Sequence, residues 1–374
     1  MKITIVSYGT IEQDGRLKEL IKTWEIIGET QVLAMTFSSE NKEYFYVKDL
    51  KSKFKIRTYL KYYLWVKKQV RKKYEKDILL IDDTLASFIG YKIRKKFNFV
   101  IQDSRELYVD KKWPGLGRVH YHFEKKMYHL ADYLISANIE RSNIMKEVFN
   151  LETLPYPYEN IRFLDEFEYD AKELDKKHKD IFKDKNVVIS TGGISVPRGT
   201  LNLIEAFKDL KEYKLLIVGK GSTDDYNSAM ELISKEQIEN VVILDRVSLS
   251  ELRYLINNSQ IGVIEYHMND LNNINCSSGK IYEYIAEGLP VVTTTNAPLV
   301  RLTKENKIGV SSNDFKEAIL SVFENYSTYK ENALKFAKKV SPEKNNKELA
   351  EAIIKAYNEK KWYGPKKRVF EKLF

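Results

Sequence analysis

Three charged residues that lie beside glycines could together hold an anionic ligand. Arg198 precedes Gly199 in "VPRGT", and Lys280 and Glu283 follow Gly279 in "SSGKIYEYIAEGLPVV". An arginine at the start of an expected helix offers paired donors to a phosphate, and the free N–H groups of the helix add to the attraction. A lysine in the first turn of a helix is disfavoured by the helix dipole unless an anion is also present. The pattern therefore indicates an anion site.

Each of these features also has a simpler structural explanation. An isolated "PRG" arginine is more often a surface residue, and Lys280 and Glu283 could form an i,i+3 ion pair worth only a few tenths of a kcal/mol. Gly193 and Gly219, in "STGG" and "VGKG", follow apolar runs, where a tight turn explains them as well as a nucleotide does. For Glu283 taken alone, the ion pair is the better interpretation.

Short apolar runs alternate with helical patterns along the whole chain, which is typical of parallel α/β architecture. The strands expected in the first half are 2–8, 30–37, 77–82, 97–103 and 131–137. Those expected in the second half are 186–193, 213–221, 240–247, 261–266, 289–295 and 308–312. Helical patterns lie between them, such as "GRLKELIKTWEII" at 15–27.

This rhythm predicts two Rossmann-like domains that face a deep inter-domain cleft, residues 1–164 and 165–344. The charged segment 165–186 is expected to connect them, and the helical C-terminal region, about 345–374, is a candidate for packing back on the first domain. Ligands of open α/β sheets bind beyond the carboxyl ends of the strands. Gly9 and Arg246 follow such strands, so they join the candidate donor site with Ser278.

Bulk composition limits the class of protein. The chain has 374 residues, 43% of them hydrophobic, and its single cysteine, Cys276, excludes an internal disulfide framework and any multi-cysteine metal site. No apolar run reaches the roughly 18 residues that span a bilayer, and "MKITIVSYGT" lacks the features of a signal peptide. We therefore expect a cytoplasmic protein. The net charge of +9 favours anionic partners, although base composition of the genome explains much of the lysine.

The stretch "TYLKYYLWVKKQVRKKYEK" at 58–76 combines aromatic and basic residues. Wound as a helix, this stretch places its tyrosines and valines on a single face, namely Tyr59, Tyr62, Tyr63, Val66, Val70 and Tyr74. The opposite face carries Lys61, Lys68 and Lys72. Such a helix suits the interface of an anionic membrane, which would place the protein at the inner face of that membrane. Packing of the tyrosines onto the first sheet is an equally good interpretation, and no recognised module supports nucleic-acid binding.

Several motifs in order resemble the retaining GT-B glycosyltransferases of the glycosyl transferases group 1 type. The donor-site motif of that family is similar to "SGKIYEYIAEGLPVV" and "PRGTLNLIEAF". Four further stretches resemble other parts of these enzymes: "DGRLKEL", "IQDSRELY", "LADYLISANIERSNIM" and "LPYPYEN". The resemblance covers nearly the whole chain.

The resemblance implies roles for particular residues. Arg198 and Lys280 would neutralise the nucleotide diphosphate, and Glu283 would accept hydrogen bonds from the ribose. Preorganised cations stabilise the leaving phosphate without a metal, so no metal or cofactor is expected. On the acceptor side, Arg105 occupies the position of the family's catalytic histidine, and Asp103 and Glu106 are neighbouring carboxylates.

Three positions depart from the family pattern. Asn275 replaces a glutamate eight positions before Glu283, and Gly193 occupies a slot that often holds arginine. Arg105 is permanently charged and cannot act as a general base, although it could orient an acceptor or hold a phosphate. Asp103 and Glu106 could substitute as the base, although strand-end capping is the simpler role for either.

The resemblance implies a hexosyltransferase-like enzyme that moves a sugar, with retention, from a nucleotide sugar to an acceptor. The donor would be UDP-linked, and the acceptor a cell-surface glycan, a lipid-linked intermediate or a protein. One alternative is a non-catalytic GT-B subunit that binds a glycan or a partner transferase, in a homo- or hetero-oligomer. Another is a nucleotide-sugar epimerase. No nucleic-acid partner is expected.

Overall fold

A computed structural model describes residues 1–12, 14–47, 55–70, 77–109, 115–183, 186–276 and 278–363 of the chain. It divides into two compact units. Unit 1 consists of residues Met1–Glu159 and Pro342–Phe374, and unit 2 of Asn160–Ser341. The first boundary therefore lies a few residues before the expected position at 164/165. Among the described helices, none has the length and apolar character required to cross a bilayer.

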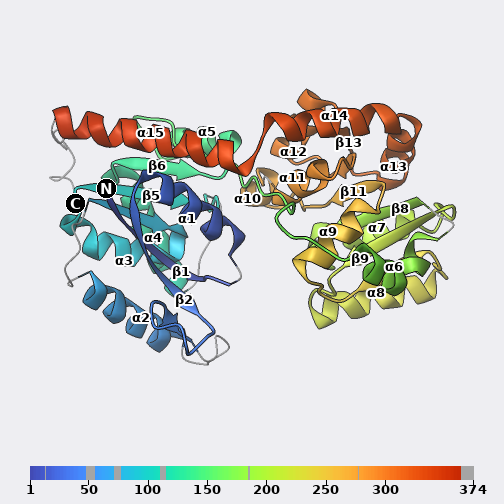
Figure 1. The fold of residues 1–374 in the computed structure, drawn as a ribbon, viewed down its shortest axis with the longest axis horizontal. Coiled ribbons are helices and arrows are strands. Elements are labelled where there is room, and N and C mark those ends of the chain that lie inside the picture. Colours follow the sequence, from blue (N-terminus) through green and yellow to red (C-terminus); the bar gives the residue numbers. More distant parts are fainter. Residues whose placement is uncertain are drawn as a thin grey trace. The chain divides into compact units, whose positions relative to one another are not determined.

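Unit 1 is built on a seven-stranded parallel sheet with the order β3-β2-β1-β4-β5-β6-β7. Its strands are β1 (Lys2–Thr10), β2 (Glu29–Thr36), β3 (Phe45–Tyr46), β4 (Ile78–Asp82), β5 (Phe99–Ser104), β6 (Tyr133–Ser136) and β7 (Tyr156–Pro157). The helices are α1 (Gly15–Ile27), α2 (Lys55–Gln69), α3 (Asp83–Ile93), the short 3₁₀ helix η1 (Arg94–Lys96), α4 (Gly115–Leu130), α5 (Ile139–Val148) and α15 (Pro342–Tyr363). Figure 1 shows these elements along the chain.

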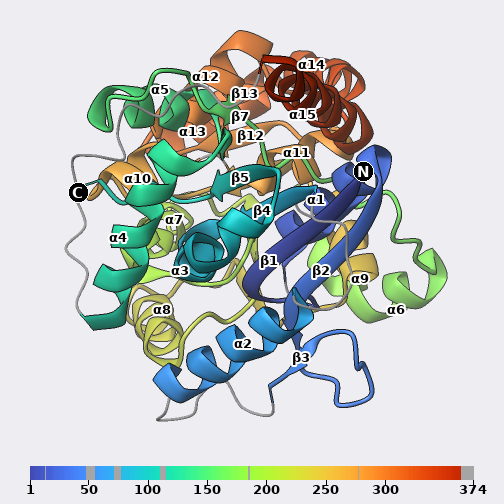
Figure 2. The same cartoon turned by 90° about the vertical axis from the view of Figure 1, so that its left-hand side faces the viewer.

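Successive side chains of a strand point to opposite faces of the sheet, so unit 1 has two hydrophobic cores, one on each face. Helices α1 and α15 contribute Trp24 and Ile353 to one core, while α2, α3 and α4 contribute Tyr62, Ile89 and Met127 to the other. All five side chains are buried. Figure 2 shows α2, α3 and α4 next to one another beside the first sheet.

The C-terminal region ends in a helix, α15, that belongs to unit 1. On α15, Leu349, Ala350 and Ile353 are fully buried. The Asn346 amide donates to Glu19 Oε2 of α1 at 3.0 Å, and the Tyr158 hydroxyl donates to Asn346 Oδ1 at 2.6 Å. Residues 364–374 of the predicted helical region lie outside the described residues.

Unit 2 contains a six-stranded parallel sheet with the order β10-β9-β8-β11-β12-β13. Its strands are β8 (Asn186–Thr191), β9 (Tyr213–Val218), β10 (Val241–Leu244), β11 (Ile261–Ile264), β12 (Val291–Thr293) and β13 (Gly309–Ser311). The helices are α6 (Ala171–Phe182), η2 (Val196–Arg198), α7 (Thr200–Ala206), α8 (Thr223–Lys235), α9 (Leu249–Asn257), α10 (Leu271–Ile274), α11 (Gly279–Ala286), α12 (Ala297–Asn306), α13 (Phe315–Glu324) and α14 (Tyr326–Lys339). Every strand predicted in both halves is confirmed.

The charged segment 165–186, expected to be a connection, is instead part of unit 2. The Asp170 side chain caps α6 by accepting from the backbone N–H groups of Lys172 and Glu173. Ile181 is buried in the core of the unit, and the His178 ring lies 2.7 Å from Glu251 Oε1 of α9. The sequence of this helix contains few apolar residues, because one narrow apolar stripe is enough to pack it against the rest of unit 2.

Candidate functional site

Two glycine turns form the floor of the candidate site in unit 2. Strand β8 ends at Gly192 and Gly193, both with positive φ, and β9 ends at Gly219 with φ 106°. A Cβ on Gly219 would lie 2.9 Å from Gly193 Cα, so the two turns touch through bare backbone. Side chains at these positions would force the turns apart, because real Cβ atoms do not approach that closely.

Arg198 lies directly after β8, at the end of η2 and before α7. Its guanidinium stacks on the ring of Tyr266, with Cζ 5.0 Å from the ring centroid. The side chain is half-buried and forms no ion pair with any residue that the structure describes. Gly199, with φ 97°, turns the chain from η2 into α7. The arginine is therefore held in position by an aromatic face while its charge stays available.

Lys280 reaches the same place from the first turn of α11. The Ser278 hydroxyl caps this helix by accepting from the Lys280 backbone N–H. Gly279 lies against Asn160, because a Cβ there would be 3.0 Å from the Asn160 amide nitrogen. The lysine side chain crosses to the end of β8, where a Cβ on Gly192 would lie 2.9 Å from Nζ. Ser278 and Gly279 thus begin the helix whose Lys280 side chain reaches the end of β8.

The two cations affect each other electrostatically. Burial lowers the pKa of Lys280, the carboxylate of Glu265 opposes this shift, and Arg198 lowers the pKa further. Lys280 makes no ion pair within the described part of the chain. Two neighbouring cations that lack an ion-pair partner repel each other, so an anion bound beside them would be stabilised.

Glu265 is a residue of the site that sequence reasoning missed. It follows β11, is 2% exposed, and accepts from the Ser190 hydroxyl at 2.9 and 3.1 Å and from the Thr200 hydroxyl at 3.3 Å. These bonds tie the ends of β8 and β11 to the start of α7. An acid near the end of the predicted strand 261–266 was the available signal, but many surface acids share that pattern.

Glu283 lies on α11 and is 3% exposed, yet its ion-pair partner is not Lys280. Its Oε1 accepts from Arg162 Nε at 3.0 Å and also from Arg162 Nη2. Oε2 accepts no hydrogen bond from a described residue. The predicted i,i+3 ion pair with Lys280 is therefore wrong, and no local pattern indicates Arg162 as the partner. One carboxylate oxygen is fixed by a guanidinium while the other remains available as an acceptor.

Arg246 is the one donor-site candidate in unit 2 that the structure does not bring to the other cations. It follows β10 and is exposed, and its backbone N–H donates to Asp245 Oδ1 at 2.8 Å. Its neighbour Asp245 pairs with Lys220 at 3.0 Å. Within the described residues, the Arg246 side chain makes no contact with Arg198 or Lys280.

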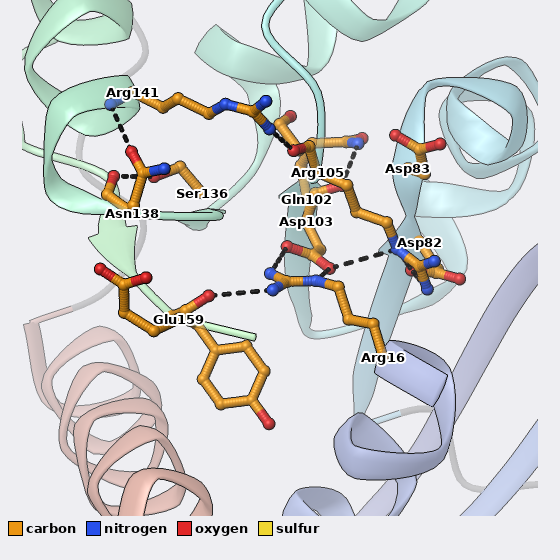
Figure 3. Close-up of polar contacts among 12 residues, drawn as sticks. Arg16, Asp82, Asp83, Gln102, Asp103, Arg105, Ser136, Asn138, Arg141 and Glu159 are labelled. Atoms are coloured by element: carbon orange, nitrogen blue, oxygen red, sulfur yellow. Dashed lines mark hydrogen bonds and ion pairs between the residues drawn. The ribbon is translucent and has the colours of Figure 1, made fainter. Parts of the chain in front are cut away.

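Asp103 and Arg105, two of the candidate catalytic residues of unit 1, belong to a buried network of ion pairs (Figure 3). Asp103 is fully buried and accepts from Arg16 Nε at 3.1 Å and Nη2 at 2.8 Å. Arg105 donates from Nε to Asp82 Oδ1 at 2.8 Å and from Nη1 to Asp14 Oδ2 at 2.6 Å. Because both arginines are matched by carboxylates, this network joins β4, β5 and α1 rather than presenting free charge.

Glu106 and Gly9 border this network. Glu106 lies 3.3 Å from Arg141 Nη2, and Arg141 also donates to the Arg105 carbonyl. A Cβ on Gly9 would lie 3.2 Å from Asp14 Oδ2, so the glycine leaves space for the carboxylate that holds Arg105. Gly9 therefore lies beside the acidic network of unit 1, and Glu106 is the most exposed of the three catalytic candidates.

Asp83 is a second residue that the sequence did not single out. It follows β4 in the left-handed region, with φ 66°, which is uncommon for a residue other than glycine. Burial raises its pKa to about 7, while the Arg105 cation opposes the shift. Its neighbour Asp82 binds Arg105, and Asp83 itself begins α3. Asp83 is thus able to exchange a proton near neutral pH.

Comparison with solved structures defines the class of fold. Sucrose-phosphate synthase from Thermosynechococcus elongatus superposes with a TM-score of 0.74 at 14% identity, covering 96% of this chain and 100% of that one. Anabaena HepE in complex with UDP gives a TM-score of 0.70 at 14% identity, with coverage of 95% and 100%. The two parallel sheets with interleaved helices are therefore the GT-B fold, as predicted.

Sequence comparisons indicate the family. Residues 185–325 match the family model of glycosyl transferases group 1. An uncharacterized glycosyltransferase of Methanocaldococcus jannaschii is 28% identical over 176 residues, which cover 46% of this chain and 41% of the relative. The alignment thus spans less than half of either protein. Residues 185–325 therefore resemble the glycosyl transferases group 1, and the described chain has the GT-B fold.

Proposed function

We propose that the protein transfers a glycosyl group from a nucleoside diphosphate sugar, with UDP as the expected nucleotide. The observation that carries this proposal is the meeting of Arg198 and Lys280 at the end of β8 without an ion-pair partner among the described residues. A diphosphate supplies the negative charge that these cations require. The solved HepE complexes with UDP and with UDP-glucose support the choice of nucleotide.

The same cations account for the chemistry that the site would perform. As the sugar leaves, negative charge accumulates on the departing diphosphate, and cations already held in position stabilise that charge without reorganising. Tyr266 holds Arg198 in place, and Glu265 opposes the fall in the pKa of Lys280. Arg198 and Lys280 would then do the work that a metal ion does elsewhere, so we propose metal-independent transfer. Retention of configuration is part of the proposal.

We assign Glu283 to the ribose. Its free oxygen, Oε2, lies on the helix that also carries Lys280, and Arg162 keeps the carboxylate oriented. For the acceptor we keep the classes of a cell-surface glycan, a lipid-linked intermediate or a protein. Of the three predicted acceptor-side residues, Asp103 is buried and paired with Arg16, and Arg105 is paired with Asp14 and Asp82. We therefore expect Asp103 and Arg105 to position the site rather than to contact the acceptor.

Release of nucleoside diphosphate from a panel of UDP-, GDP- and ADP-sugars, with and without glycan acceptors, tests the proposal. We expect release from a UDP-sugar and its loss in Arg198→Ala/Lys280→Ala. Lys220→Ala is the matched control. Lys220 is another cation that follows a strand of unit 2, in this case β9, but it is paired with Asp245. Turnover with no donor would favour a non-catalytic GT-B subunit. Conversion of the sugar without release of diphosphate would favour an epimerase.

A further inference from the structure

Three helices share one continuous face of unit 1. The Tyr59 hydroxyl of α2 donates to the Leu85 carbonyl of α3 at 2.9 Å, and the Tyr59 ring lies 4.5 Å from the ring of His120 of α4. Phe88 of α3 packs against Phe123 of α4 at 5.0 Å. Helices α2, α3 and α4, with η1 at the end of α3, therefore present a single outer surface, the three-helix face.

The three-helix face is strongly basic. Its exposed cations come from all four elements: Arg57, Lys61, Lys68, Lys92, Lys95, Lys96, Arg118 and Lys125. The carboxylates on the same elements are Asp83, which is half-buried at the start of α3, and Glu124, which is fully buried. As far as the structure describes this face, none of its exposed residues is acidic.

A general excess of lysine in the chain does not explain this distribution. On the other side of the same sheet, α15 also carries several lysines, but acids alternate with them, as in the pair formed by Lys347 and Glu351 at 3.9 Å. A genomic bias that enriches lysine would act on α15 and on the three-helix face alike. The absence of exposed acids is therefore particular to the described part of the three-helix face.

The same face also exposes large apolar side chains in a regular line. Ile56, Leu60 and Leu64 follow one another at a spacing of four residues along α2, and they are 51%, 50% and 61% exposed. Since residues four apart lie on one side of a helix, these three form a stripe. Leu85 of α3 and Val119 of α4 add exposed fractions of 41% and 42%.

Half-buried aromatic rings lie between the helices, with lysines above them. Lys92 Nζ is 5.6 Å from the ring centroid of Phe88, Lys126 Nζ is 5.8 Å from that of Tyr91, and Lys67 Nζ is 6.0 Å from that of Tyr63. The apolar stems of these lysines cover the rings while the ammonium groups reach the surface. This arrangement suits a boundary between an apolar layer and a layer of negative charge.

We propose that the three-helix face binds the surface of an anionic lipid bilayer, with Ile56, Leu60 and Leu64 inserted among the acyl chains and the lysines on the headgroups. Electrostatic attraction and burial of apolar area are the two contributions that hold proteins at such a surface. A nucleic acid would satisfy the charges but would leave the apolar stripe exposed. The inference concerns unit 1 and stands apart from the proposed donor chemistry of unit 2.

The structure changes which residues of 58–76 would face the lipid. Tyr59, Tyr62, Val66 and Val70 are buried against the first sheet, which confirms the packing interpretation for those residues. The opposite side of α2, with the exposed stripe and with Lys61 and Lys68, is the side that would bind lipid. Residues 71–76, including the predicted Lys72 and Tyr74, lie outside the described residues.

Sedimentation of the full chain with phosphatidylcholine vesicles, with and without phosphatidylglycerol, tests the charge contribution. We expect binding only with phosphatidylglycerol, and a loss of at least about 25-fold in Lys61→Glu/Lys68→Glu, since each cation near the surface is worth about five-fold. The matched control on α15, Lys347→Glu/Lys355→Glu, makes the same change in net charge and should bind like the wild type. Equal loss in both variants would overturn the assignment to this face.

Leu60→Ser/Leu64→Ser tests the apolar contribution without changing charge. We expect vesicle affinity to fall at least about ten-fold, because two exposed leucines would no longer be buried in lipid. Unchanged affinity, or binding of the wild type to DNA but not to anionic vesicles, would overturn the proposal. Thermal unfolding confirms that the variants fold, and calorimetry with UDP reports on unit 2 separately, so a failure of donor binding would not be mistaken for a failure here.

Discussion

Glu283 pairs with Arg162, which lies 121 positions earlier in the chain, and not with Lys280 one turn away on its own helix. This choice of partner separates two functions on one short helix. The carboxylate is fixed by Arg162 through one oxygen, while Lys280, at the end of β8, forms no ion pair with any described residue. Had Lys280 and Glu283 paired with each other, neither would be available to a ligand.

Glu283→Ala should weaken UDP binding by about ten-fold or more, because a charged hydrogen bond acceptor contributes about 1.5–3 kcal/mol. Isothermal calorimetry measures the change. Glu287→Ala is the matched control, since Glu287 lies just after α11 and also pairs with an arginine, Arg253, at 2.7 Å. Equal affinity of Glu283→Ala and wild type would remove Glu283 from the nucleotide site.

The pH dependence of UDP binding should reveal Lys280. Burial lowers the pKa of the free lysine, with Arg198 adding to the shift and Glu265 and Glu283 opposing it. A bound diphosphate favours the charged form, so the pKa rises on binding and the complex takes up a proton. Affinity should therefore fall as the pH rises through the alkaline range, by up to about ten-fold per pH unit.

Lys280→Arg provides the comparison, because a guanidinium stays charged throughout that range. We expect its affinity for UDP to change little with pH while that of the wild type falls. Calorimetry in buffers of different ionisation enthalpy detects the proton uptake directly. Parallel pH profiles for the two proteins would show that the titrating group is not Lys280.

The sequence was sufficient for the strands other than the two-residue edge strands β3 and β7, and for expecting the two cations of unit 2 at one sheet edge. Apolar runs in a parallel sheet bring their carboxyl ends to one edge, so Arg198 after β8 and Lys280 at the start of α11 could be expected to meet. Gly193 and Gly219 could be placed at that edge for the same reason. These features depend on periodicity and chain order, which a single sequence contains.

The pairing of charges over long distances could not be obtained in that way. Arg162 and Glu283, or Arg105 with Asp14 and Asp82, are joined by the fold alone, and no local spacing distinguishes them from other charges. Helix α2 shows a different limit. It is apolar on two sides, the side of Tyr59 and Tyr62 and the side of Leu60 and Leu64, so periodicity could not decide which one packs on the sheet.

Gly221→Ala should destabilise unit 2 more than Gly199→Ala, although both glycines have positive φ. A Cβ at Gly221 would lie 2.0 Å from the Ile194 carbonyl oxygen, so the two turns of the site would have to separate. We expect a loss of about 3 kcal/mol or more in the free energy of unfolding, measured by urea titration. UDP affinity should fall as well.

Gly199→Ala is the control for that experiment. Gly199 has φ 97°, but a Cβ there meets no atom within 4 Å. Its substitution should cost only the strain of a left-handed alanine, about 1–2 kcal/mol. A similar loss at both positions would mean that backbone conformation, rather than contact between the turns, dominates at Gly221.

Glu124 should make the protein less stable as the pH rises from about 5 to about 8. The side chain is fully buried and accepts from the Thr84 hydroxyl at 2.8 Å and the Ser104 hydroxyl at 2.9 Å. Burial raises its pKa from 4.5 to about 8, and the charge of Asp83 adds to the shift. Between these pH values the folded protein keeps a proton that the unfolded chain has lost. Stability therefore falls with rising pH, by at most about 1.4 kcal/mol per unit.

Glu124→Gln imitates the protonated carboxyl and keeps an oxygen that accepts from one hydroxyl, so its unfolding free energy should depend less on pH. We expect it to exceed the wild type in stability above pH 8 and to match it near pH 5, because only the ionised form of Glu124 is costly when buried. Glu348→Gln, an exposed change on α15, should follow the wild-type profile. Urea titrations across this range measure the slopes, and a Glu124→Gln slope equal to that of the wild type would assign the pH dependence to other groups, Asp83 first among them.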